Sequence, residues 1–178
     1  MNIETVKSWR PCSDGLVWLN SQPDLDTAWR TCQRGDWLLW GLRQGDILDK
    51  TTAVRIAVAF ADHVLPVFDR KYPEDTRPRV AIEAVKAWLK KPTKANRRAA
   101  AAAAYAAAAA ADAAADAADA AAAADTAYAV YHAYAAAIGA AEVAADAYDD
   151  ARAKERKWQA DKLRELCANP FLDQTHAE

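Results

Sequence analysis

An alanine-rich tract in the second half of the chain constrains the fold more than any other feature. Of the 53 residues from 99 to 151, 34 are alanine. Alanine has the highest helix propensity and loses no side-chain entropy on folding, so the tract predicts helix. One unbroken helix over residues 94–168 would be about 110 Å long. We therefore expect a break, either at residues 125–126 or at Gly139, and close packing of the alanine faces as an antiparallel hairpin.

The large apolar side chains lie mostly before residue 92, where six of the seven tryptophans are found. Residues 1–23 are expected to be irregular, because Pro11, Gly15 and Pro23 interrupt them. A short helix is expected from Pro23 to about Arg34. The segment "DWLLWGLR" predicts a second short helix, with Asp36 as its N-cap and glycines that limit it to a turn or two.

Two longer helices follow, and no stretch alternates with the period of a strand. The first, from Asp49 or Thr51 to about residue 71, contains Pro66, which either kinks it or starts a new turn. The second begins at Thr76 and stops at Pro92. Apolar residues recur every three or four positions on both, which predicts one buried face on each. These faces are Ala53, Ile56, Ala57, Phe60, Val64, Val67 and Phe68, and then Val80, Ala81, Ala84, Val85 and Trp88.

The sequence thus predicts an all-α helical bundle in a single domain over residues 1–178. It divides into a tryptophan-rich helical part (1–92), the long alanine-rich helices (93–168) and a tail (169–178). Residues 1–98 carry 17 Lys and Arg against 12 Asp and Glu, whereas residues 99–178 carry 6 against 13. Opposite net charges favour docking of one part on the other, or a polar partner site on each.

Several classes of function are disfavoured by composition. The three cysteines, Cys12, Cys32 and Cys167, lack disulfide or zinc spacing and are expected to be buried free thiols in the cytoplasm. We see no secretory signal, and no run reaches the roughly 18 strongly apolar residues of a membrane span. Mixed charge without a basic, aromatic-interleaved stripe disfavours nucleic-acid binding. No cofactor or metal is expected.

An arginine cluster is the best candidate for a binding site. Arg77 and Arg79 open a predicted helix, where free backbone N–H groups and the helix dipole favour an anion, and Arg55 lies one helix earlier. The alternative is that these arginines pair with neighbouring carboxylates. His63, between Asp62 and the Val64–Pro66 segment, is the best candidate for a functional imidazole, although a core histidine is favoured. No nucleophile and base can be assembled, so no enzyme is predicted.

Six features together resemble an immunity protein family, whose members are alanine-rich all-helical proteins of bacteria and their phages. They are Trp29 with Cys32, "DWLLW", "HVLP", "YPEDTRPRVAIEAVKAW", the alanine tract and "LRELCANPF". The resemblance covers most of the chain and implies a non-enzymatic protein that binds and blocks a toxin or a component of host defence. The tract here is purer in alanine than expected for the family, with fewer arginines.

Two functions follow from these observations. An inhibitor of a protein partner would present an exposed surface of Trp, Arg and Asp, for which Asp36 and Trp40 are candidates. A protein that sequesters a phosphorylated or nucleotide-like ligand would instead use Arg55, His63, Arg77 and Arg79. Long alanine faces would also allow a homodimer in either case.

Overall fold

The computed structural model describes residues 1–108 and 149–171, and these two ranges contain eight α-helices and no strand. The predicted all-α class is therefore confirmed. The helices are α1 (Ile3–Ser8), α2 (Ser13–Asn20), α3 (Leu25–Thr31), α4 (Gly35–Gln44), α5 (Lys50–Lys71), α6 (Arg77–Lys90), α7 (Lys94–Ala108) and α10 (Asp149–Leu166).

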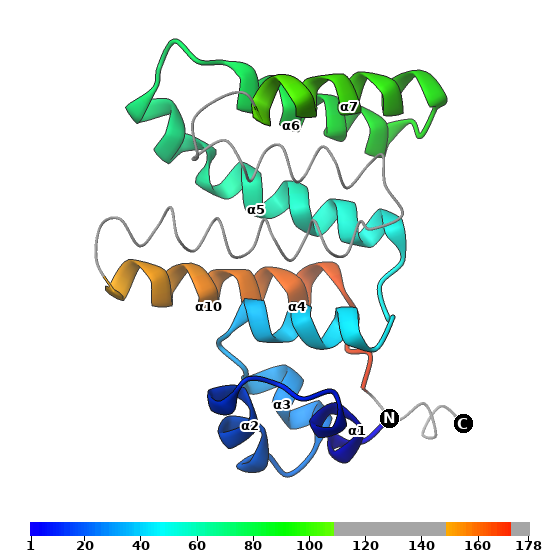
Figure 1. Cartoon of the computed structure of the whole chain (residues 1–178), viewed down its shortest axis with the longest axis vertical. Coiled ribbons are helices and arrows are strands. Elements are labelled where there is room, and N and C mark those ends of the chain that lie inside the picture. The colour runs from blue at the N-terminus through cyan, green and yellow to red at the C-terminus, as the bar shows by residue number, and fades with distance from the viewer. Residues whose placement is uncertain (109–148, 172–178) are drawn as a thin grey trace.

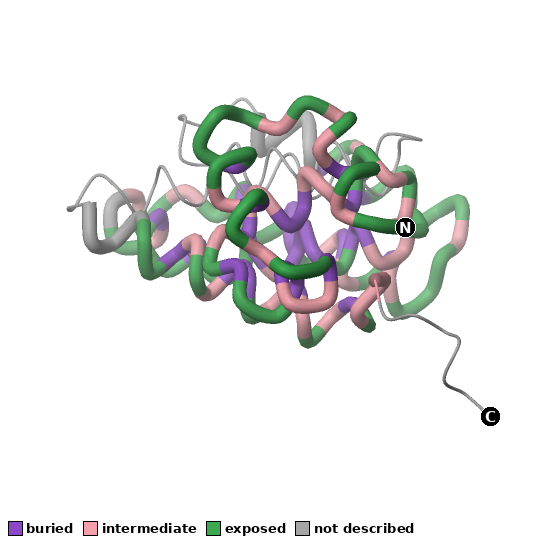
Figure 2. The backbone as a smooth tube through the Cα atoms, turned by 90° about the horizontal axis from the view of Figure 1, so that it is seen from below, coloured by how far each residue is buried: buried purple, intermediate pink, exposed green. Residues whose placement is uncertain are grey.

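The helices are stacked in layers around α5 (Figure 1). The pair α6 and α7 packs on one side of α5, and α10 packs on the other side, where it also contacts α4. The short helices α1, α2 and α3 gather beyond α4, at the end of the molecule farthest from α6 and α7. Buried residues run through the middle of this stack, as Figure 2 shows.

Helix α5 forms the centre of the core. Asp49 caps it, as one of the two predicted alternatives, by accepting hydrogen bonds from the backbone N–H groups of Thr51 and Thr52. The helix continues through Pro66 without ending there. By length and composition α5 could cross a membrane, but more than half of it is buried by neighbouring helices, as in the core helix of a folded domain. Of its predicted apolar face, Val67 alone is exposed.

Helix α6 has Thr76 at its N-cap position, but Thr76 makes no capping hydrogen bond. Asp75 takes this role instead, because its Oδ1 accepts from the backbone N–H of Arg77 at 3.1 Å. Ala81, Val85 and Trp88 are buried as predicted. Val80 was predicted to face inward, but it is 55% exposed, which is unusual for a large apolar side chain at the start of a core helix.

The first 45 residues are more helical than predicted. The segment expected to be irregular forms α1 and α2, capped by Asn2 and Cys12. Asp36 is not an N-cap, since α4 begins at Gly35 with Arg34 in the cap position. The helix also runs through Gly41 to Gln44, longer than a turn or two, because its apolar residues are held against α10. Tertiary packing here outweighs the low helix propensity of glycine.

The alanine-rich tract begins within α7, and its last residues begin α10. Residues 125–126 and Gly139, the two predicted break points, lie outside the described residues, as does most of the proposed hairpin. After α10, Phe171 folds back and packs edge-on against Trp29 of α3, with ring centroids 6.0 Å apart. This contact joins the end of the described chain to its N-terminal helices.

Candidate functional site

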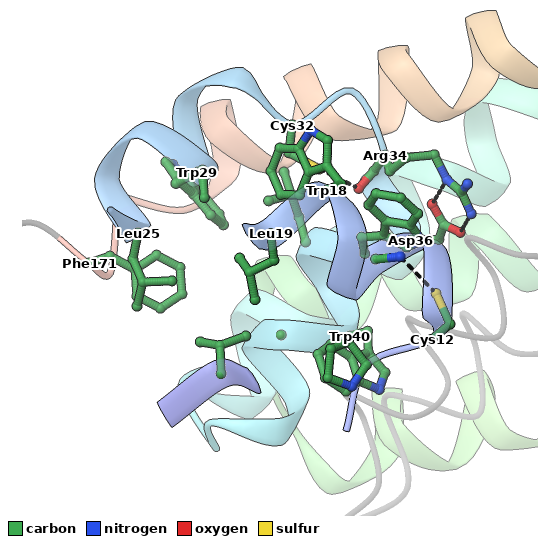
Figure 3. A pocket seen from close by; sticks show the side chains of 17 residues that line it. Cys12, Trp18, Leu19, Leu25, Trp29, Cys32, Arg34, Asp36, Trp40 and Phe171 are labelled. Carbon is green, nitrogen blue, oxygen red and sulfur yellow. Dashed lines mark hydrogen bonds and ion pairs between the residues drawn. The ribbon is translucent and has the colours of Figure 1, made fainter. Parts of the chain in front are cut away.

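A pocket of about 330 Å³ opens between helices α1 to α4, and Phe171 closes one end of it (Figure 3). Residues of α1, α2 and α3 form a smaller core cluster of Val6, Leu19, Leu25 and Ala28, and all four line the pocket. Helix α4 belongs to the main core cluster together with α5 and α10. The pocket therefore lies between two packed bodies of the protein instead of inside one.

Aromatic side chains form most of the pocket wall. Trp18 and Trp37, from α2 and α4, lie tilted with centroids 5.8 Å apart. Trp40, one turn further along α4, is held edge-on by Trp9 at 6.4 Å. Trp29 contributes from α3. Such pairs add stabilisation beyond area burial and fix the ring planes, so the wall is rigid before anything binds.

The polar groups of the pocket gather at the end away from Phe171 and Leu25 (Figure 3). Arg34 binds Asp36 through two hydrogen bonds, Nε to Oδ1 at 2.8 Å and Nη2 to Oδ2 at 2.5 Å. Its guanidinium also lies 4.4 Å from the centroid of Trp37. The Asp36 carboxylate raises the pKa of Arg34 above its usual value. Arg156 of α10 approaches the same carboxylate, with Nε 3.9 Å from Oδ2.

Two cysteines also line the pocket, in different states. Cys12 is exposed and caps α2, where its Sγ accepts a hydrogen bond from the backbone N–H of Gly15 at 3.4 Å. Cys32 is buried, and desolvation raises the pKa of its thiol to about 11. Cys167 lies elsewhere in the core and is buried in the same way. The expectation of buried thiols holds for two of the three and is wrong for Cys12.

Among the residues singled out from the sequence, the structure brings Asp36 and Trp40 together in this pocket. Arg77 and Arg79 also lie close together, but each is paired with a carboxylate. Arg77 binds Asp75 through Nε at 2.8 Å and Nη2 at 2.6 Å, and Arg79 binds Asp69. These are the neighbouring carboxylates that the alternative interpretation of the cluster had named.

Arg55 and His63 do not join this pair of arginines. Arg55 lies 14 residues before Asp69 on α5, which corresponds to about 21 Å along the helix. His63 faces α10, where it stacks flat on Trp158 with centroids 3.6 Å apart. Burial and the nearby Lys162 ammonium lower the pKa of His63. His63 therefore belongs to the packing between α5 and α10.

Sequence reasoning missed most of the pocket, including Cys12, Trp18, Trp29, Trp37, Arg34 and Phe171. The concentration of tryptophan before residue 92 was the available signal. It did not lead to the pocket, because α1 and α2 were expected to be irregular. Within the described parts of the chain, no group of three or more His, Cys, Asp or Glu residues is arranged to hold a metal ion.

One model of a known protein family matches the central part of the chain. The model of the Imm-5 like putative immunity protein family matches residues 46–166. The chain belongs to this family. Comparisons with curated proteins and with solved structures find no match. The matched range starts just after α4 and ends with α10, so it covers the helices α5, α6, α7 and α10.

The pocket and the family match do not overlap. Every residue that lines the pocket lies before residue 42 or is Phe171, outside residues 46–166. The paired arginines, the exposed Val67 and Val80, and the His63–Trp158 stack all lie inside the match.

Proposed function

We propose that this protein is a non-enzymatic immunity protein that binds a partner protein, a toxin or a component of host defence, and blocks it in the cytoplasm. Membership of the immunity protein family carries this proposal, because the match spans about two thirds of the chain. The family is generally non-catalytic, and inhibition by such a protein requires a rigid contact surface in place of a reaction centre.

The corner where α5 ends and α6 begins is the contact surface that we favour. Val67 and Val80 are both exposed there, and the ion pair of Arg79 with Asp69 links their helices. Arg77 adds a second exposed guanidinium. Partner surfaces are enriched in arginine and need apolar area at their centre, and this corner offers both within the matched range.

Co-expression tests this function directly. Toxins encoded beside the gene are expressed in a bacterial host, alone and with this protein. We expect growth to be restored and a stoichiometric complex to be purified with one of them. Val80→Asp should weaken that complex at least tenfold. Val17→Asp on α2, where the side chain is 72% exposed, is the matched control and should leave it unchanged. Absence of any complex and any rescue would reject the proposal.

The sequestration of a nucleotide-like ligand is less well supported, because Arg77 and Arg79 each form an ion pair with one carboxylate, so each pair is neutral. A bound anion would place a further negative charge beside Asp75 or Asp69. A thermal-shift panel of nucleotides and cyclic nucleotides should therefore show no rise in melting temperature. A rise that is lost in Arg77→Ala and Arg79→Ala would favour sequestration instead.

A further inference from the structure

The pocket between α1 and α4 opens to the surface and has a volume of about 330 Å³. Gly41 lines it from within α4, where glycine is less favourable than alanine. A Cβ atom at Gly41 would meet nothing within 4 Å. A larger residue would fill the space and strengthen the helix, so the sequence leaves room that packing does not require.

The size and lining of the pocket match those of a small-molecule site. Ligand pockets have volumes of about 300 to 1,000 Å³ and are lined mainly by apolar and aromatic residues with a few polar groups. Here four tryptophans and Phe171 supply the aromatic surface. Arg34 and Asp36 are the charged residues of the lining. Flat indole walls complement a flat aromatic ligand better than a branched aliphatic one.

The polar end of the pocket favours a negative charge on the ligand. Arg34 uses Nε and Nη2 for Asp36, and its Nη1 makes no hydrogen bond among the described residues. Arg156 brings a second positive charge to the same carboxylate, so the three groups sum to one positive charge. The first turn of α2, capped by Cys12, adds the positive end of a helix dipole, which the exposed Asp14 in the same turn partly offsets.

We infer that this pocket binds a small aromatic carboxylate, with its ring between the tryptophans and its carboxylate at Arg34. This site lies outside the family match and does not depend on the proposed inhibition of a partner protein. A bound ring would cover the aromatic wall, and its carboxylate would lie at the polar end beside Cys12. The exposed Cys12 thiol then reports occupancy, since the other two cysteines are buried.

Calorimetry on the full chain tests the site with 1-naphthoate and with 1-naphthylmethylammonium, which has a similar ring and the opposite charge. We expect 1-naphthoate to bind at one site, at least tenfold more tightly than the ammonium probe. We also expect it to slow alkylation of Cys12 by the neutral reagent iodoacetamide at least threefold. No binding of 1-naphthoate, or equal or tighter binding of the ammonium probe, would overturn the inference.

Two variants locate the binding. Gly41→Leu places a side chain in the pocket, so 1-naphthoate affinity should fall at least tenfold while the melting temperature does not fall. Arg34→Gln should remove the preference for 1-naphthoate over the ammonium probe. Arg79→Gln is the matched control, since it removes an arginine from an exposed ion pair on α6. Unchanged 1-naphthoate binding by Gly41→Leu, or an equal loss of preference in Arg79→Gln, would reject this site.

Discussion

The Nε2 atom of His63 lies 3.1 Å from Oε2 of Glu155, so α5 and α10 are joined through two titratable groups. Glu155 is buried, and its other oxygen accepts a hydrogen bond from the side-chain amide of the buried Gln159 at 3.2 Å. Trp158 covers the imidazole, and the Lys162 ammonium is close enough to lower the pKa of His63. Burial raises the pKa of Glu155 to about 7, so near neutral pH both groups favour their uncharged forms.

Stability should therefore change with pH through Glu155. Its pKa is about 7 in the folded protein, against 4.5 for an ordinary glutamate, so folding favours the protonated carboxyl. The contribution to stability is fully present below pH 4.5 and is lost as pH rises from 4.5 through 7. At 1.36 kcal/mol per pKa unit, the loss is up to about 3 kcal/mol.

Glu155→Gln tests the contribution of Glu155 ionisation to stability, because the amide keeps the shape and the hydrogen bonds of the protonated carboxyl. Urea unfolding at pH 8.5 should show the variant more stable than the wild type by up to about 3 kcal/mol. At pH 5 the difference should not exceed about 1 kcal/mol. A gain of equal size at both pH values, or in the exposed control Glu83→Gln, would contradict this account.

The cysteines should differ sharply in reactivity. Burial raises the pKa of Cys32 and of Cys167 to about 11, so at pH 8 about one in a thousand of either thiol would be ionised. Cys12 is exposed. Mass spectrometry after brief treatment with iodoacetamide should show one modified cysteine in the native protein and three in urea. Cys12→Ser should show none in the native state. Labelling of Cys32 at a rate comparable to that of Cys12 would contradict the structure.

The predictions from sequence were most accurate where a local sequence pattern and the tertiary packing favour the same structure. Asp49 was one of two alternatives for the cap of α5, and the apolar spacing of α5 identified a face that is buried except at Val67. In each case residues near one another in sequence carry the signal, so no knowledge of distant contacts was needed.

The pocket could not be predicted, because it is formed by contacts between residues that lie far apart in the sequence. Nothing near Trp18 in sequence indicates that it meets Trp37 of α4. Arg34 and Arg156 are also far apart in the chain, yet both approach Asp36. Val80 fits the apolar period of α6, but its side chain is 55% exposed, whereas Ala81 and Ile82 next to it in the chain are buried.

Arg164 of α10 should be needed to attach α3 to the rest of the protein. Its Nε donates to the backbone carbonyl of Trp29 at 2.8 Å, and its Nη2 donates to that of Cys32. These carbonyls lie at the end of α3, where helix groups lack partners of their own. A lysine cannot reach both, so Arg164→Lys should cost about 1 to 3 kcal/mol in urea unfolding.

Arg30→Lys is the control for this substitution. Arg30 forms an exposed pair with Asp26 on α3, and such pairs contribute under about 1 kcal/mol. The control should therefore lose less than about 0.5 kcal/mol. If both variants lost the same amount, the carbonyl contacts of Arg164 would not be what holds α3 in place.

Two glycines at opposite ends of one helix should respond in opposite ways to the same substitution. Gly35 begins α4 where it crosses α10, and a Cβ there would lie 2.4 Å from Cβ of Gln159 and 2.8 Å from the backbone nitrogen of Ala160. Backbone atoms cannot move aside cheaply, so Gly35→Ala should destabilise the protein by roughly 3 kcal/mol or more. At Gly41 the same methyl group enters open space. Gly41→Ala should therefore stabilise by about 0.5 to 1 kcal/mol through helix propensity and a less flexible unfolded chain. Urea unfolding of both variants under one set of conditions measures the difference. Equal effects would mean that α4 and α10 do not approach each other as closely as the structure places them.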